Sequence, residues 1–117
     1  MSEKEQREFW KKFYEALDAG DAETAAALFP DGTVIHLWDG KTFHTQEEFK
    51  EWFIKLRSTS ENAKRKIISF KVDGNISYVE VELKAKIKGE SKVVKLRHIF
   101  KFEGDKLVEV DVTIKPI

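Results

Sequence analysis

The sequence predicts an α+β fold in which three N-terminal helices pack on a curved antiparallel sheet, with a small hairpin before the third helix. Three observations lead to this fold class. Apolar residues recur at helical spacing in the first half of the chain, apolar and polar residues alternate in the second half, and Gly-containing turn signals separate the alternating segments. Residues 1–117 are expected to form a single domain, because the chain is near the common domain size and has no linker-like tract.

The first helix is predicted to begin after Ser2 and to end near Ala19. Ser2 is a favourable N-cap, and Gly20 is typical of the position that follows a helix. Its apolar stripe consists of Phe9, Phe13, Ala16 and Leu17. Tyr14 and Asp18 lie four residues apart along the flank of this stripe, so the helix would bring a phenol and a carboxylate to the edge of the core.

A short helix and a hairpin are expected next. Asp21 caps a helix predicted over residues 22–29. Residues 33–38 and 41–43 are predicted strands, and the Asp39-Gly40 pair between them is typical of a type I′ turn.

Thr45 and Glu48 form a capping box that opens the third helix. Its core stripe is Phe49, Trp52, Phe53 and Leu56. Residues 58–62 are interpreted as a polar connection.

Four long strands complete the chain, at about residues 64–72, 76–87, 91–102 and 107–115. The first breaks the alternation, since Ile68, Phe70 and Val72 share one parity while Arg65 and Ile67 share the other. A β-bulge at Ile68 and the residue after it would turn both sets inward and bend the sheet.

Four polar residues interrupt the inward-facing apolar pattern: Tyr14, Asp18, Arg65 and His98. Each alone has an ordinary structural explanation, such as a tyrosine hydroxyl at the rim of a core or a histidine satisfied within it. Together they indicate a pocket, because a charge buried without a partner is costly. We expect Asp18 to pair with Arg65 in a bidentate contact, and Tyr14 to hydrogen-bond with His98.

Several classes of function are disfavoured. The chain has 21 basic and 21 acidic residues, so no charge bias favours nucleic acid or a membrane surface, and no apolar run approaches ~18 residues. It has no cysteine, and His36 and His44 have no spacing that provides three metal ligands. We therefore expect no metal site, no nucleic-acid partner and no membrane partner.

The first helix and its surroundings resemble the opening of the NTF2-like superfamily, which includes ketosteroid isomerases, scytalone dehydratases and polyketide cyclases. The segments that carry this resemblance are Tyr14–Asp18, Gly20–Ala22 and Leu28–Phe29. The chain is also similar, essentially end to end, to de novo designed luciferases built on this fold. The shared pieces include Ile35–Gly40, Glu51–Phe53, Arg65 and His98.

This second resemblance implies an oxidative, light-emitting decarboxylation of a synthetic imidazopyrazinone luciferin, diphenylterazine in the first instance. Dioxygen would be the co-substrate, and no cofactor is expected because the oxygen chemistry belongs to the luciferin. Tyr14, Asp18, Arg65 and His98 would be the catalytic residues. The residues implied to bind the substrate are Phe13, Trp38, Phe49, Trp52, Phe53, Leu96, Phe100 and Val110.

In this interpretation Arg65 is a fixed cation beside the luciferin anion, and Asp18 orients it. His98 and Tyr14 hydrogen-bond the heterocycle and help the anion to form. Arg97, Ile99 and Phe100 depart from the designed family's pattern around His98, which leaves the shape of the pocket near Phe100 open.

Two other functions fit the same residues. One is acid–base chemistry of the isomerase or dehydratase kind, although an Asp18 occupied by Arg65 would be a poor base. The other is an idle scaffold or small-molecule binder, since catalysis needs groups placed to about 0.5 Å. A monomer is expected, because the outward face of the sheet is rich in Lys and Glu.

Overall fold

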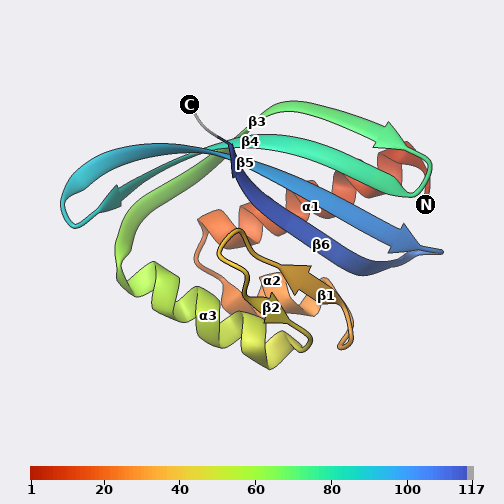
Figure 1. Cartoon of the computed structure of the whole chain (residues 1–117), viewed down its shortest axis with the longest axis horizontal. Coiled ribbons are helices and arrows are strands. Elements are labelled where there is room, and N and C mark those ends of the chain that lie inside the picture. Colours follow the sequence, from red (N-terminus) through yellow and green to blue (C-terminus); the bar gives the residue numbers. More distant parts are fainter. Residues whose placement is uncertain (116–117) are drawn as a thin grey trace.

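The predicted α+β class is confirmed by a computed structural model that describes residues 1–115. In chain order the elements are α1 (Glu3–Asp18), α2 (Ala22–Ala27), β1 (Val34–His36), β2 (Thr42–Phe43), α3 (Gln46–Ser58), β3 (Ser60–Asp73), β4 (Ile76–Ile87), β5 (Glu90–Glu103) and β6 (Lys106–Lys115). The helices lie on one side of a strongly curved sheet, which arches over them (Figure 1).

The six strands form one sheet in the order β2-β1-β6-β5-β4-β3. Strands β3 to β6 make the expected antiparallel meander, but β1 runs parallel to β6, with His36 opposite Asp111. The sheet is therefore mixed and not wholly antiparallel, because the small hairpin extends the main sheet instead of standing apart from it. Local periodicity identified both strands of the hairpin but could not reveal a partner so distant in the sequence.

The bulge predicted in β3 is present. Ile67 pairs with Val81 and Ser69 pairs with Glu80, so Ile68 is the extra residue. Ile68 itself is 45% exposed, and the expectation that it faces inward stays a prediction. The extra residue lets both Ile67, which packs against the core, and Phe70, whose ring centre lies 5.4 Å from that of Trp10, face the helices.

The start of β3 also differs from the prediction. The strand begins at Ser60, within the stretch interpreted as a polar connection, and pairs there with the end of β4. A second irregularity lies between Glu61 and Lys64, where Asn62 adopts a positive φ of 55°. This polar sequence forms a strand because the long β4–β5 hairpin offers it a partner.

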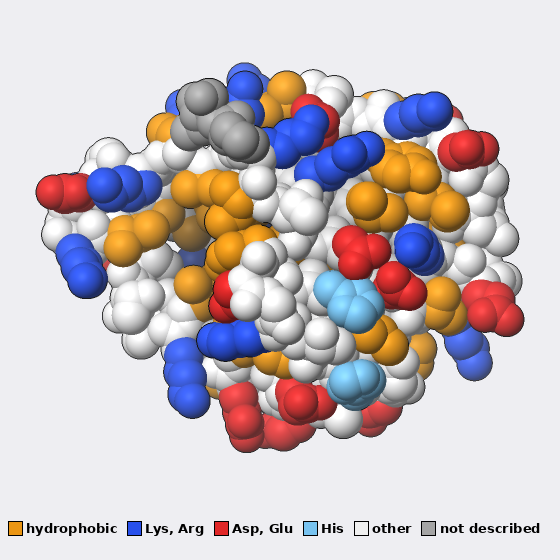
Figure 2. All heavy atoms as spheres, viewed as in Figure 1, with side chains coloured by type: hydrophobic (Ala, Val, Ile, Leu, Met, Phe, Trp, Pro, Cys, Tyr) orange, Lys and Arg blue, Asp and Glu red, His pale blue; other side chains and the backbone are white. Residues whose placement is uncertain are grey.

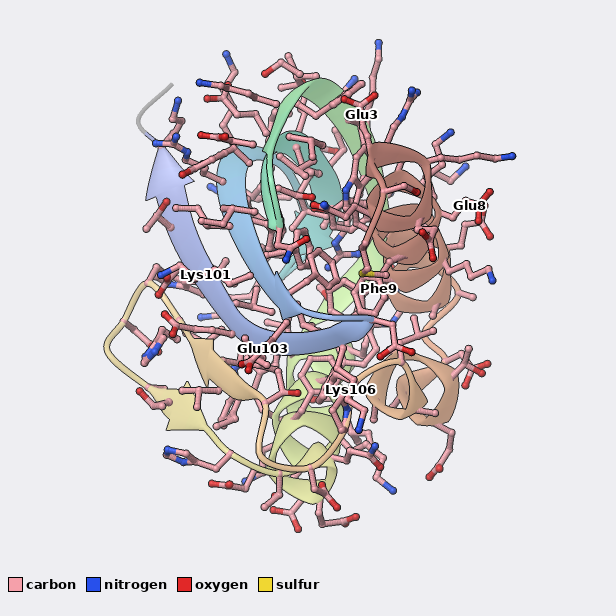
Figure 3. The ribbon with its side chains drawn as sticks, turned by 90° about the vertical axis from the view of Figure 1, so that its right-hand side faces the viewer. Glu3, Glu8, Phe9, Lys101, Glu103 and Lys106 are labelled. Carbon is pink, nitrogen blue, oxygen red and sulfur yellow. The ribbon has the colours of Figure 1, made fainter. Side chains whose placement is uncertain are left out.

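Both predicted caps of α1 are present. Ser2 and Glu5 form a capping box, and Gly20 follows the helix with a φ of +72°. Figure 3 shows Glu8 pointing away from the molecule and Phe9 pointing inward, where its ring meets that of Phe102 at 5.3 Å. No helix within residues 1–115 has the length and apolar character needed to cross a membrane.

A buried amide, which the sequence analysis missed, fixes the start of α1 against the sheet. Gln6 is fully buried and donates to the backbone oxygens of Met1 and Gly74. Its oxygen accepts a hydrogen bond from Ser77 at 2.6 Å. Because Gly74 lies in the β3–β4 turn and Ser77 on β4, these two contacts set the position of α1 and hence of the side chains that follow on it.

Candidate functional site

An apolar cavity of about 280 Å³ lies between the helices and the concave face of the sheet. Its wall includes all eight residues predicted to bind a substrate: Phe13, Trp38, Phe49, Trp52, Phe53, Leu96, Phe100 and Val110. Figure 2 shows hydrophobic side chains gathered around a hollow in this face of the molecule. The volume is close to the lower end of the range typical of sites for drug-sized ligands, about 300–1,000 Å³.

Arg65 brings a positive charge to this wall. Its side chain is only 7% exposed, and its Nη1 donates to Oδ1 of Asp18 at 2.8 Å. The other carboxylate oxygen, Oδ2, accepts from the backbone N–H of Arg65 at 3.1 Å. The expected pair is present, but the expected bidentate contact between fork and carboxylate is wrong, because the backbone takes the second oxygen.

This geometry leaves part of the guanidinium without a partner. The Nε atom of Arg65 is buried and makes no hydrogen bond with any residue from 1 to 115. Burial lowers the pKa of Arg65 and the ion pair with Asp18 opposes that shift. The guanidinium still carries its proton near neutral pH, because its ordinary pKa lies so far above that range.

Tyr14 and His98 form the second pair, with 3.0 Å between Tyr14 Oη and His98 Nδ1. Burial lowers the pKa of His98 to about 3, and the nearby charge of Arg65 acts in the same direction. Burial also raises the pKa of Tyr14, which therefore keeps its proton. The histidine is neutral at pH 7.

The tautomer of His98 is assigned from this pairing. No other residue within 1–115 accepts a hydrogen bond from Tyr14, so we assign its hydroxyl as the donor to Nδ1 and place the imidazole proton on Nε2. His98 and Arg65 line the cavity, whereas Tyr14 and Asp18 stand behind them. In each pair, one residue (Arg65 or His98) offers a hydrogen-bond donor to the cavity, and its partner (Asp18 or Tyr14) holds that donor in position.

Phe100, whose effect the sequence left open, is fully buried and packs beside His98. The two rings are stacked at 5.7 Å, and Phe100 also meets Phe13 edge-on at 6.1 Å. Phe100 therefore holds the imidazole from one face while Tyr14 fixes it through Nδ1.

A polar cluster outside the cavity was missed by the sequence analysis. His36, Glu109 and Asp111 place potential metal ligands within 4.8 Å of one another, because β1 lies beside β6. Lys101 Nζ lies 3.3 Å from Glu109 and 3.8 Å from Asp111, so a cation of the chain itself already pairs with both carboxylates and offsets one of their two negative charges. The expectation of no metal site stays a prediction.

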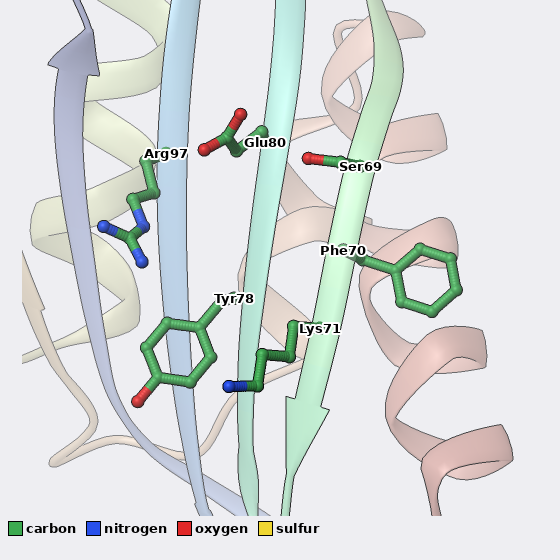
Figure 4. Close-up of a pocket in the computed structure, with 6 residues that line it drawn as sticks. All are labelled: Ser69, Phe70, Lys71, Tyr78, Glu80 and Arg97. Atoms are coloured by element: carbon green, nitrogen blue, oxygen red, sulfur yellow. The ribbon is translucent and has the colours of Figure 1, made fainter.

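A second, shallower hollow lies on the outer face of the sheet (Figure 4). It is lined by Ser69, Phe70, Lys71, Tyr78, Glu80 and Arg97. The Arg97 guanidinium lies 5.4 Å from the centre of the Tyr78 ring, and Glu80 pairs with Lys115. Apart from Phe70, whose ring packs against Trp10 of α1, these residues form a polar surface with alternating charges on the side of the sheet away from the helices.

Comparison with known proteins places the chain in a family. The model of the SnoaL-like domain matches residues 10–110. Among solved structures, PrhC from Penicillium brasilianum has a TM-score of 0.85 at 16% identity, covering 96% of this chain and 81% of its own. A putative SnoaL-like polyketide cyclase from Shewanella denitrificans has a TM-score of 0.84 at 11% identity, covering 97% and 92%.

An LEH-like epoxide hydrolase from M. tuberculosis has a TM-score of 0.80 at 14% identity, covering 96% of this chain and 84% of its own. At sequence identities this low, the similarity of these structures to the chain shows a common fold and nothing more. No curated protein matches the sequence. The NTF2-like fold predicted from the sequence is confirmed, and the chain belongs to the SnoaL-like domain family.

Proposed function

We propose that this protein is a luciferase that catalyses the oxidation of a synthetic imidazopyrazinone luciferin, with diphenylterazine as the substrate to test first. The luciferin loses its ring N–H proton to water or buffer, and its anion reacts with dioxygen to form a dioxetanone. Cleavage of the O–O and C–C bonds of that ring releases carbon dioxide and leaves an excited amide that emits light. One oxygen atom of dioxygen leaves in carbon dioxide, and the other becomes the amide carbonyl.

The observation that carries this proposal is a buried cation in a wall that is otherwise uncharged. Arg65 is the only Lys, Arg, Asp or Glu that lines the cavity within residues 1–115. A fixed positive charge in a dry site stabilises negative charge more strongly than it would in water. An electron-rich aromatic anion is therefore the species that this cavity favours.

The remaining polar groups have supporting roles in this proposal. The neutral His98 donates from Nε2 to the carbonyl oxygen or a ring nitrogen of the luciferin, and Tyr14 holds the tautomer that makes this donation possible. Asp18 orients Arg65 through its two hydrogen bonds. The aromatic walls clamp the aryl substituents and exclude water.

Acid–base catalysis of the isomerase or dehydratase kind is the weaker candidate. Both oxygens of Asp18 are engaged by Arg65, and Asp18 stands outside the cavity wall. A histidine with a pKa of about 3 is a weak base near neutral pH. The site therefore lacks a carboxylate or histidine suited to removing a proton from carbon.

Photon counting tests the proposal directly. Purified protein is mixed with diphenylterazine in air, and the emission is compared with that of the free luciferin. We expect emission well above that background and a loss of about 10²–10³ in Arg65→Ala, the size of effect seen when one group that stabilises an oxyanion is removed. Arg97→Ala, which removes a guanidinium on the outer face of the sheet, is the matched control and should keep its emission.

Two results would contradict the proposal. If a folded Arg65→Ala variant were as bright as the parent, the proposed role of Arg65 in stabilising the luciferin anion would be wrong. A folded parent that binds diphenylterazine without emitting would indicate a binding scaffold, and turnover of an unsaturated steroid ketone would then test the acid–base alternative.

A further inference from the structure

We infer that the cavity is also a binding site for medium-chain aliphatic carboxylates, with the carboxylate at Arg65 and the chain along the apolar walls. This inference goes beyond luciferin chemistry and depends only on the charge, hydrogen bonding and size of the cavity.

The charge of the cavity selects anions. Arg65 is the sole formally charged side chain on the wall within residues 1–115, and His98 is neutral. A second guanidinium, that of Arg57, stands near enough to act on Arg65. Asp18 compensates one of these two positive charges, so the three groups together carry a net positive charge.

Unsatisfied donors point to an oxygen ligand. Asp18 occupies only Nη1 of Arg65, and no other residue within 1–115 accepts a hydrogen bond from this guanidinium. Nε is buried and closed off, whereas Nη2 is not among the closed-off atoms and has no partner within residues 1–115, so it is the donor that an acceptor in the cavity can reach. His98 offers a further N–H from the same wall, so the two oxygens of a carboxylate each have a donor.

The lining of the cavity favours an aliphatic chain. Within residues 1–115 its wall is apolar apart from Arg65 and His98, and its volume is about 280 Å³. Trp38 and Ile114 line the cavity and are also exposed, which marks an apolar mouth. A saturated chain of medium length can therefore lie along the walls toward this mouth, and the test varies its length.

The test is a fluorescence titration, because Trp38 and Trp52 line the cavity and report its occupancy. Hexanoate, octanoate, decanoate and decanol are titrated into the protein without luciferin. Each added methylene should tighten binding about four-fold, and decanoate should bind about 10- to 100-fold more tightly than decanol. Equal affinity for decanoate and decanol in the parent protein, or no binding of either, would overturn the inference.

Two variants locate the carboxylate. Arg65→Met keeps the length of the side chain and should abolish the preference for decanoate over decanol. Arg97→Met, on the outer face of the sheet, should leave that preference intact. If Arg65→Met does not fold, the comparison of decanoate with decanol in the parent still decides the matter.

This inference and the luciferase proposal fail separately. The titration needs no light, so a dark protein that prefers decanoate would overturn the luciferase proposal and support the carboxylate site. A luminous protein that does not distinguish decanoate from decanol would overturn the carboxylate site alone.

Discussion

Acid is expected to destabilise this protein through His98. The imidazole is buried and neutral, with a pKa near 3 in the folded state and an ordinary value of 6.5 when exposed. Between these two pKa values, His98 is protonated in the unfolded chain and neutral in the folded chain. Stability from this group is fully present above the unfolded pKa and is lost as the pH falls from about 6.5 toward about 3.

The size of the effect follows from the two pKa values. Each unit of pH between them costs about 1.4 kcal/mol, so going from about pH 7 to about pH 4.5 lowers the free energy of unfolding by ~2.5 kcal/mol. With a urea dependence of about 1–3 kcal/mol per molar, the midpoint of unfolding should fall by about 0.8–2.5 M.

Urea denaturation at several pH values, followed by tryptophan fluorescence, measures this loss. His98→Gln keeps an acceptor for Tyr14 but cannot be protonated, so the difference between parent and variant isolates the histidine. The window stops near the ordinary pKa of Glu, 4.5, because Glu5 and Glu80 have pKa values lowered by hydrogen bonds and add their own losses below it. If parent and variant lost equal stability over this window, the account of a buried neutral His98 would be refuted.

Two further predictions concern stability, each paired with a control. Phe53→Ala should lower the free energy of unfolding by about 3–5 kcal/mol in urea denaturation, since this ring is 1% exposed. Its control is Ile54→Ala, at a residue that is 60% exposed, which should change the free energy of unfolding by no more than about 0.5 kcal/mol. Equal losses in the two variants would contradict the packing of α3. Gly20→Ala should cost about the ~1–2 kcal/mol of a left-handed alanine, because the atom nearest its Cβ, Nη2 of Arg57 at 2.7 Å, is the end of a flexible side chain that can move aside. Gly40→Ala also has a positive φ and meets nothing within 4 Å, so the two variants should lose similar stability in thermal or urea denaturation, and a much larger loss at Gly20 would show that Arg57 is held in place.

The β-bulge illustrates how far local pattern reaches. A change of parity between Ile67 and Phe70 was enough to locate the inserted residue, because both apolar sets had to face the helices. Parity alone cannot say which residue of the bulge is the extra one, and the pairing of β3 with β4 identifies it as Ile68.

The candidate site was predictable as a set of residues but not as a set of contacts. Tyr14, Asp18, Arg65 and His98 stood out because each interrupts an apolar face. That Asp18 gives one oxygen to the backbone of Arg65, and so leaves Nε unpartnered, follows from the local course of β3 after its first irregularity. No sequence pattern encodes that division of hydrogen bonds.

The sequence by itself determined the helices, the long strands, the caps and the inward faces, because helical and strand periodicity are set by backbone geometry over a few residues. Only the tertiary structure decided what joins across the chain. Tyr14 meets His98 over 84 positions, Asp18 meets Arg65 over 47, and β1 pairs with β6 beyond the third helix. Such contacts depend on the register and curvature of the whole sheet, since a shift of one residue in any strand would turn its polar side chain away from the cavity.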